Sequence, residues 1–213
     1  DGWLVPGARC LDMGVGLGGT AFYVAEAVPG VFVHGVHTSS AMASIVSGRH
    51  LKNTGGTRER VTFAIAPEYG IPEHELRYPP NSFDVVLVRE TMMYLDSQDK
   101  AVLLQKLLLL LRPGGRLVVV DYCVGRPTDE LSPYFQSYLA KWAYFPIEPK
   151  SQEALIGRSF SVKTQDLTSE FVGFMDEGLQ RIEDTFGEGS PERNPSLGRV
   201  ELDALRQPLQ DTV

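Results

Sequence analysis

The feature that most constrains the fold is a regular alternation of short apolar runs, rich in Val and Phe, with stretches of helical character. The apolar runs predict strands at Arg9 to Met13, Val31 to His37, Val61 to Ala66, Phe83 to Arg89 and Arg116 to Tyr122. Helices are predicted between most of them, at Thr20 to Val28, Ser39 to Leu51 and Ser97 to Arg112. Apolar strands that alternate with helices predict an α/β fold: a doubly wound, mostly parallel, Rossmann-like sheet flanked by helices.

The rest of the chain predicts fewer elements. Asp96 is available to cap the third of these helices, and Pro113-Gly114-Gly115 to stop it. Further on, the patterns predict a helix at Tyr134 to Phe145, a sixth strand at Ser159 to Gln165 and a helix at Ser169 to Glu183. No element is assigned to Arg199 to Val213, which belongs to a tail from about residue 190. Because 213 residues at 43% hydrophobic suit one core, we expect a single domain over residues 1–213.

Charge and composition exclude several classes of protein. The net charge is −7 and the 20 basic residues are scattered, so no basic stripe predicts nucleic-acid binding. His34 and His37 lie on one predicted strand with side chains on opposite faces, and we expect no metal. The run Leu107 to Leu111 is far shorter than the roughly 20 residues that span a bilayer. Together with Cys10 and Cys123, both in apolar contexts, this predicts a cytoplasmic protein without a membrane span.

The sequence CLDMGVGLGG, at the end of the first predicted strand, fits two glycine motifs. Gly14, Gly16 and Gly19 have the G-x-G-x-x-G spacing of dinucleotide-binding folds. Asp12, followed by Gly14, Gly16 and Gly18, has the D-x-G-x-G-x-G spacing of methyltransferases that use S-adenosylmethionine (SAM). The two ligands differ in charge near the loop, so the acidic residue distinguishes them.

Asp12 favours SAM over a dinucleotide. A carboxylate beside the loop would repel a pyrophosphate, whereas it can accept a charge-assisted hydrogen bond from the ammonium group of SAM. Two alternatives stay open: Asp12 only caps the glycine turn, or the chain is an NAD-type oxidoreductase, which the three-glycine spacing alone supports.

Five stretches resemble class I SAM-dependent methyltransferases, most closely the phosphoethanolamine N-methyltransferases of nematodes, plants and malaria parasites. They are Leu11 to Glu26, Val33 to Met42, Asn81 to Leu95, Leu111 to Cys123 and Tyr138 to Phe145. The resemblance implies the class I methyltransferase fold, SAM as cofactor and S-adenosylhomocysteine as product. It also implies a transferase of phosphocholine biosynthesis that methylates the amine of phosphoethanolamine or of its methylated forms.

The resemblance implies the following site residues. The cofactor-binding set is Asp12, Gly14, Gly16, Gly18, His37, Thr38, Ala66 and Arg89. The catalytic pair is Glu90 and Tyr94, and the substrate-binding residues are Tyr122, Trp142 and Tyr144. These positions lie mostly at strand ends, where a doubly wound sheet binds its ligands.

Four positions depart from the resembling family. His37 replaces the acidic residue that holds the ribose, and Pro67 replaces the one that meets the adenine amino group. Tyr94 stands where the family has a catalytic histidine, and Trp142 stands where it has an arginine that clasps the phosphate. These departures support an alternative: a degenerate methyltransferase-like half of a larger protein, with a structural or regulatory role. Since the chain starts at Asp1, we also expect a preceding segment, and a second methyltransferase-like half is a candidate partner.

Overall fold

The computed structural model describes residues 4–39, 41–42, 44–46, 48, 56–65 and 78–186. The chain divides into two compact units. The first comprises Asp1–Tyr122 with Arg158–Phe160, and the second comprises Cys123–Gly157 with Ser161–Val213. Whether residues 1–213 behave as a single domain stays a prediction. No described helix is long and apolar enough to cross a membrane.

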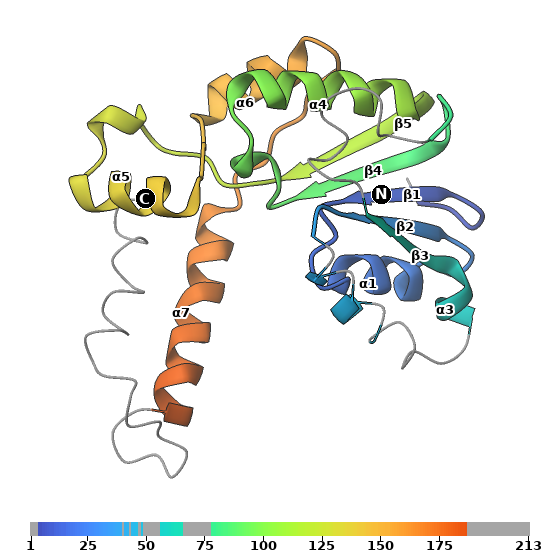
Figure 1. Ribbon diagram of the computed structural model, residues 1–213, viewed down its shortest axis with the longest axis horizontal. Helices are drawn as coiled ribbons and strands as arrows, with labels where there is room; N and C mark the ends of the chain where they lie inside the picture. The colour runs from blue at the N-terminus through green and yellow to red at the C-terminus, as the bar shows by residue number, and fades with distance from the viewer. Residues whose placement is uncertain are drawn as a thin grey trace. The chain divides into compact units, whose positions relative to one another are not determined.

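The first unit contains a parallel sheet of five strands (Figure 1). The strands are β1 (Arg9–Met13), β2 (Phe32–His37), β3 (Val61–Ile65), β4 (Phe83–Arg89) and β5 (Leu111–Val120). Their order in the sheet is β3-β2-β1-β4-β5, and every pair is parallel. This confirms the predicted α/β fold, in which the strand order reverses between β1 and β4 and creates a crevice at the carboxyl ends.

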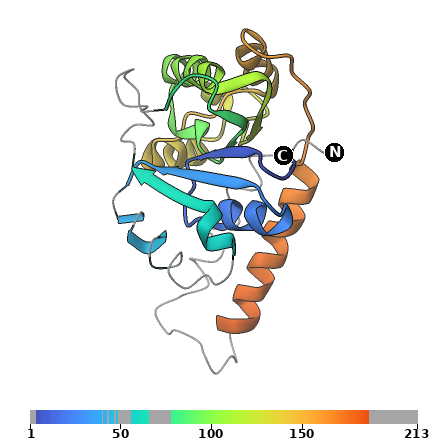
Figure 2. The same ribbon diagram turned by 90° about the vertical axis from the view of Figure 1, so that its right-hand side faces the viewer.

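The helices of this unit cover the sheet. Helix α1 (Gly19–Ala27) packs against β2 and β3, and α4 (Ser97–Leu110) packs against β5. Figures 1 and 2 show α1 on one side of the sheet and α4 on the other. Under α1, Cys10, Val33 and Val85 form one apolar layer with the helix residues Ala21 and Ala25. Burial on both sides explains why the central strands β1 and β4 are mostly apolar.

Helix α4 begins as predicted and ends early. The Asp96 carboxylate accepts the N–H groups of Gln98 and Asp99, each at 2.9 Å, which confirms the predicted cap. The helix was expected to reach Arg112, but it ends at Leu110 because Leu111 already pairs with Phe83 of β4. The register then shifts, so that Arg116 pairs with Val85.

Several expectations fall partly or wholly outside the described residues. Of the predicted helix Ser39 to Leu51, Ser39 is described and is not helical, whereas the other described residues, 41–42, 44–46 and 48, are helical. Residues 66–77, which include Ala66 and Pro67, are not among those described. The short helix α3 (Gly56–Arg60), which the sequence patterns did not predict, leads into β3.

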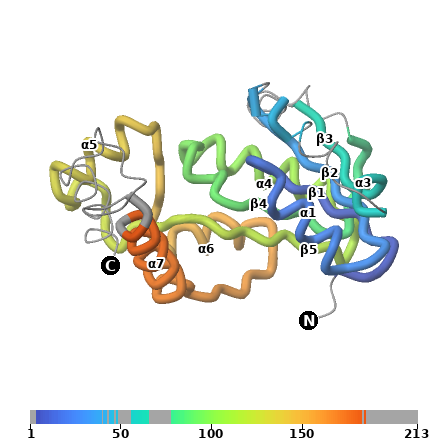
Figure 3. Tube along the Cα trace, turned by 90° about the horizontal axis from the view of Figure 1, so that it is seen from below, coloured from blue at the N-terminus to red at the C-terminus, as the bar shows by residue number. Residues whose placement is uncertain are grey.

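The second unit contains α5 (Pro133–Trp142), α6 (Pro149–Gly157) and α7 (Thr168–Phe186), whose course can be followed in Figure 3. Ser132 caps α5 by accepting the Phe135 N–H at 3.2 Å. This helix ends three residues before the predicted Phe145, because Ala143 adopts a left-handed conformation with φ of 51°. Phe135 and Leu139 of α5 pack with Val124 and Leu131 in a small core.

The predicted sixth strand at Ser159 to Gln165 is wrong. Residues 161–167 have no regular secondary structure, and residues 158–160 form a turn and a bend. The segment alternates apolar and polar residues, but Phe160 and Val162 are its only apolar side chains, too few to bury one face of a strand. Val162 instead lies against the end of the unpredicted helix α6, at Gly157.

Candidate active site

The glycine loop joins β1 to α1 in a backbone conformation that favours glycine. Gly14, Gly16 and Gly18 have φ of 80°, 52° and 81°, in the left-handed region where a side chain is strained. The N–H groups of Gly14 and Val15 both donate to the carbonyl oxygen of Val36, each at 3.1 Å. The loop is therefore fixed to β2, at the carboxyl edge of the sheet.

The three glycines differ in the space around them. A Cβ atom on Gly14 would collide with the side chain of Thr91, and one on Gly18 would lie 2.9 Å from the Phe22 ring. At Gly16, which is exposed, no described residue other than its chain neighbours has an atom within 4 Å of the Cβ position. Packing therefore demands glycine at two positions, while the backbone at Gly16 is open to a ligand.

Asp12 lies beside this loop, near the end of β1, and only 1% of its surface is exposed. Its Oδ2 atom has no hydrogen-bond partner among the described residues. Burial raises the pKa of Asp12 to about 6, although the charge of Arg89 opposes the rise. A buried carboxylate oxygen without a donor is costly, so Asp12 Oδ2 is a candidate to accept a hydrogen bond from a ligand. The alternative that Asp12 only caps the glycine turn stays open, although its Oδ2 makes no such bond among the described residues.

His37 ends the neighbouring strand β2 and is 3% exposed. Its Nε2 atom has no hydrogen-bond partner within the described part of the chain, and its ring lies 5.8 Å from that of Phe63. Burial lowers the pKa of His37, so the imidazole is neutral at pH 7. Thr38 follows it and is exposed, whereas Ala66 lies outside the described residues.

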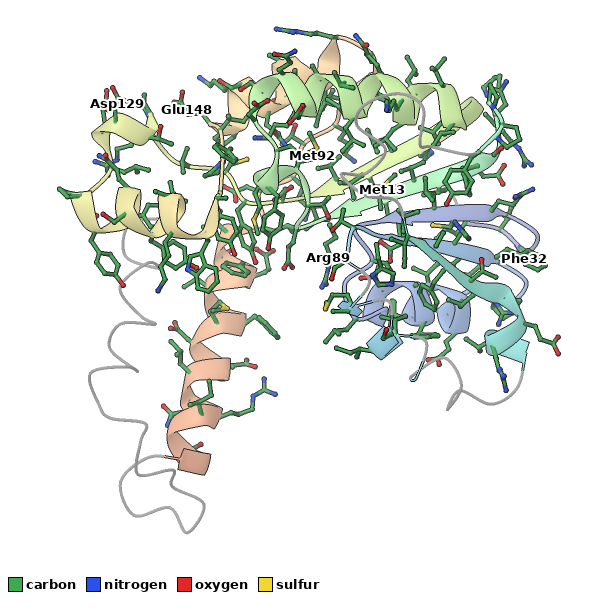
Figure 4. The ribbon with its side chains drawn as sticks, viewed as in Figure 1. Met13, Phe32, Arg89, Met92, Asp129 and Glu148 are labelled. Carbon is green, nitrogen blue, oxygen red and sulfur yellow. The ribbon has the colours of Figure 1, made fainter. Side chains whose placement is uncertain are left out.

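The predicted catalytic pair lies on a turn after β4. Glu90 adopts a left-handed conformation with φ of 48°, and its N–H donates to the Val120 carbonyl at 2.8 Å. Its carboxylate pairs with Arg89 at 3.7 Å, and both side chains are exposed. Tyr94 belongs to the 3-10 helix η3 (Met92–Tyr94) and is 45% exposed. In Figure 4 the labels of Arg89 and Met92 mark the two sides of this turn, and Met13 marks the end of β1.

Two further residues, Thr91 and Asp121, hold this turn, and the sequence analysis assigned neither a role. The buried Thr91 hydroxyl lies 2.8 Å from the Arg89 carbonyl oxygen and 3.2 Å from that of Met13. The Asp121 carboxylate accepts the N–H groups of Thr91 and Met93. An acidic residue directly after the apolar run of β5 was the available signal for Asp121.

The predicted substrate residues are divided between the units. Tyr122 closes the first unit, while Trp142 and Tyr144 belong to the second. Trp142 is exposed at the end of α5, with the Lys141 ammonium group 5.4 Å from its ring. Tyr144 is partly buried and lies against Tyr138, with 6.0 Å between ring centroids. A pocket that joins all three residues stays a prediction.

A hollow of about 430 Å³ lies at the opposite edge of the sheet, where β1 and β4 begin. It is lined by residues 5–8, 84–85 and 112–116. Its main polar feature is the ion pair between Asp84 and Arg112, at 2.7 Å. In open α/β sheets ligands bind at the carboxyl ends of the strands, so the glycine-loop edge remains the candidate site. Among the described residues no cluster of His, Cys, Asp and Glu is suited to a metal ion.

A family model described as a methyltransferase domain matches residues 11–117, which include the glycine loop and the turn after β4. The chain belongs to this methyltransferase family. The match agrees with the resemblance to class I methyltransferases. The oxidoreductase alternative is supported only by the spacing of the three glycines. Within this methyltransferase domain, the roles predicted for individual site residues stay predictions.

The domain is also similar to curated relatives that are much longer than the chain. It is 31% identical over 184 residues to a phosphoethanolamine N-methyltransferase of Triticum aestivum, which covers 84% of this chain and 33% of the relative. Over 169 residues it is 31% identical to phosphoethanolamine N-methyltransferase 2 of Caenorhabditis elegans, covering 78% of this chain and 36% of that protein. The chain thus spans about a third of the length of these relatives.

Solved structures of phosphoethanolamine N-methyltransferases are also similar to this chain. Phosphoethanolamine N-methyltransferase 2 of Haemonchus contortus in complex with SAM matches with a TM-score of 0.78 and 26% identity. The match covers 97% of this chain and 45% of that one. The same nematode enzyme in complex with phosphomonomethylethanolamine and S-adenosylhomocysteine matches with a TM-score of 0.77 and 27% identity, over the same shares. These matches confirm the class I methyltransferase fold.

Proposed function

We propose that this methyltransferase domain binds SAM at the glycine loop and methylates a small amine, phosphoethanolamine or one of its methylated forms. The observation that carries the proposal is the buried Asp12 carboxylate, whose Oδ2 has no partner among the described residues and which stands on the strand that leads into the glycine loop. An ammonium group supplies the donor and the positive charge that this oxygen lacks. A pyrophosphate supplies neither.

His37 is proposed to contact the ribose of the cofactor. Its Nε2 is buried without a partner in the described part of the chain, and its neutral ring offers one hydrogen bond at that atom. A carboxylate at the same place would accept from both ribose hydroxyls. The domain is therefore expected to bind SAM more weakly than a relative with an acidic residue there, but not to lose it, because Asp12 and the loop are intact.

The chemistry is a direct displacement. Bound SAM supplies a methyl group on a sulfonium centre, and the protein must align an unprotonated amine with it in a dry site. A phenol has a pKa of about 10 and is a poor base at neutral pH, so Tyr94 is proposed to orient the amine by a hydrogen bond. The Glu90 carboxylate, on the same turn, receives the proton that the amine releases, directly or through water.

The choice of phosphoethanolamine rests on the relatives, which carry that activity in their names, and on the phosphorylated amine bound to the Haemonchus contortus enzyme. Tyr122 and Tyr144 are proposed to contact the substrate. Trp142 has no positive charge, so phosphate binding is expected to be weaker than with an arginine there. The proposed setting is cytoplasmic phosphocholine biosynthesis.

A degenerate methyltransferase-like half of a longer protein is the second candidate. It is favoured by His37 at the ribose position and by the length of the relatives, of which this chain covers about a third. In that case the partner is a second, active half, and this domain has a structural or regulatory role.

The deciding experiment is a methyl-transfer assay with labelled SAM and phosphoethanolamine, monomethyl or dimethyl phosphoethanolamine, or ethanolamine. The proposed function predicts turnover of the phosphorylated amines that is lost in Asp12→Ala. Asp84→Asn is the matched control, since it removes a paired carboxylate at the opposite edge of the sheet and should keep activity. Absence of turnover with every amine, together with absence of SAM binding, would favour the degenerate half.

A further inference from the structure

Asp121 follows β5 directly and collects backbone N–H groups from two segments. Its Oδ2 accepts from Thr91 at 3.3 Å and from Met93 at 3.1 Å, and its Oδ1 accepts from Tyr122 at 2.9 Å. Burial raises the pKa of Asp121 even though these N–H groups favour the ionised form. Two of these three donors come from the turn that carries Glu90 and Tyr94, and Met92 of the same turn adds a further backbone hydrogen bond.

This turn is strained and needs support. Glu90 is not glycine and yet has φ of 48°, a conformation that persists when the surroundings fix it from several sides. On one side, the Glu90 N–H donates to Val120, the last residue of β5. On the other side, Asp121 holds the next residues through their own N–H groups.

The same contacts reach the cofactor loop. The Thr91 hydroxyl lies within hydrogen-bond distance of the carbonyl oxygen of Met13, the last residue of β1. The Thr91 side chain also occupies the space where a Cβ atom of Gly14 would lie. A chain of contacts therefore runs from Asp121 through Thr91 to the glycine loop, and from Asp121 through Met93 to Tyr94.

We propose that Asp121 is a positioning residue that fixes the turn carrying Glu90 and Tyr94 against the glycine loop. It sets the distance between the methyl acceptor and the cofactor by holding the backbone of Thr91 and Met93. The inference rests on the proposed function, since it assigns the acceptor to this turn and the cofactor to the loop. The sequence patterns predicted neither cofactor binding nor catalysis for Asp121.

The test is Asp121→Asn. The amide has almost the shape of the carboxylate, but its NH₂ group must face at least one of these N–H donors. Three quantities are measured in the parent and the variant: amide hydrogen exchange at Thr91 and Met93 by NMR, the affinity for S-adenosylhomocysteine by calorimetry, and kcat and KM for phosphoethanolamine.

Positioning predicts a specific combination of results. Exchange at Thr91 and Met93 should rise about tenfold or more as their hydrogen bonds open. The kcat should fall about ten- to hundredfold, since a shift near 1 Å in reacting groups has such an effect. Affinity for S-adenosylhomocysteine should stay within about threefold, because the glycine loop is bonded directly to Val36, whereas Asp121 reaches it only through Thr91.

Asp84→Asn is the matched control, because Asp84 also accepts a backbone N–H, that of Arg9 at 2.8 Å, but at the other end of β4. It should reduce stability without a loss of kcat. Unchanged exchange in Asp121→Asn, unchanged kcat, or a fall in activity that only follows the folded fraction would overturn the inference. If the parent neither binds S-adenosylhomocysteine nor turns over, the proposed function fails, and exchange at Thr91 and Met93 alone decides whether Asp121 holds the turn.

Discussion

The carboxyl edge of the sheet has two parts that are built in opposite ways. At the ends of β1 and β2, the polar side chains of Asp12 and His37 are buried and each has a polar atom without a partner among the described residues. After β4, the side chains of Glu90 and Tyr94 are exposed, and the backbone of their turn is held by hydrogen bonds. The first part buries polar atoms at a cost in stability, whereas the second fixes the backbone of its turn and exposes its side chains.

Mutations in the two parts should have different effects. Substitutions at the buried part should change the stability of the protein and its affinity for the cofactor together. Substitutions of the exposed side chains should change turnover with little effect on stability, because surface substitutions usually alter it by less than about 0.5 kcal/mol. Departures from the resembling family at Tyr94 can therefore alter the substrate without unfolding the domain.

The largest expected effect is that of Gly14→Ala. A left-handed alanine costs about 1–2 kcal/mol, and the collision with Thr91 adds an overpacking cost of about 1–3 kcal/mol. Gly16→Ala has the same type of strain but open space, so it should cost only the first amount. Urea unfolding of both variants checks the difference. Equal losses of stability would mean that Thr91 does not close the loop as described.

Asp12→Asn should stabilise the protein at neutral pH. The pKa of Asp12 is about 6 when folded against an ordinary value of 3.8, so the folded state binds more protons between these values. Ionisation above pH 6 thus costs up to about 3 kcal/mol of stability, which the amide avoids. Below pH 3.8 the carboxylic acid is neutral in both states and the gain should vanish.

Asp84→Asn should behave in the opposite way. Burial alone would raise the pKa of Asp84, but the Arg9 N–H and the Arg112 guanidinium outweigh it and lower the pKa. A lowered pKa stabilises the fold above the unfolded value of 3.8, and this stabilisation is lost as the pH falls. Thermal unfolding of the two variants from pH 3 to pH 8 separates them. If both variants changed the stability of the protein in the same direction at pH 7, the interpretation of Asp12 as a ligand-binding carboxylate would be contradicted.

His37→Asp tests whether His37, in the buried part, contacts the ribose of the cofactor. A carboxylate can accept from both ribose hydroxyls, and one added hydrogen bond to a charged group contributes about 1.5–3 kcal/mol. Affinity for S-adenosylhomocysteine should therefore increase about tenfold or more, as measured by calorimetry at pH 7.5. Unchanged or weaker binding would show that His37 does not contact the ribose.

Tyr94→Phe tests the exposed part and has the smallest expected effect. Loss of one hydrogen bond to the amine, at about 0.5–1.5 kcal/mol, should lower kcat/KM about two- to tenfold. The melting temperature and the affinity for S-adenosylhomocysteine should not change, since the side chain is 45% exposed and lies on the turn after β4, away from the glycine loop's own residues. A large loss of stability would contradict the contrast between the two parts.

The sequence predicted the features that depend on neighbouring residues and missed those that depend on distant contacts. The bounds of β1 and β4 and the cap at Asp96 are local signals, and all three were confirmed. The prediction of a sixth strand was wrong because the segment alternates apolar and polar residues but has too few apolar side chains to bury one face. The roles of Thr91 and Asp121 depend on contacts across 30 and 78 positions of the chain, which no local pattern encodes.

Whether the Asp12 carboxylate receives the ammonium group of the ligand is tested by the affinity for S-adenosylhomocysteine as a function of pH. This affinity is measured by calorimetry for the parent and for Asp12→Asn. If the Asp12 carboxylate receives the ammonium group, the parent should bind well at pH 7.5 and progressively more weakly as the pH falls through about 6. Asp12→Asn should bind about ten- to hundredfold more weakly at pH 7.5, with little dependence on pH. Equal affinity of the two proteins across this range would contradict the account.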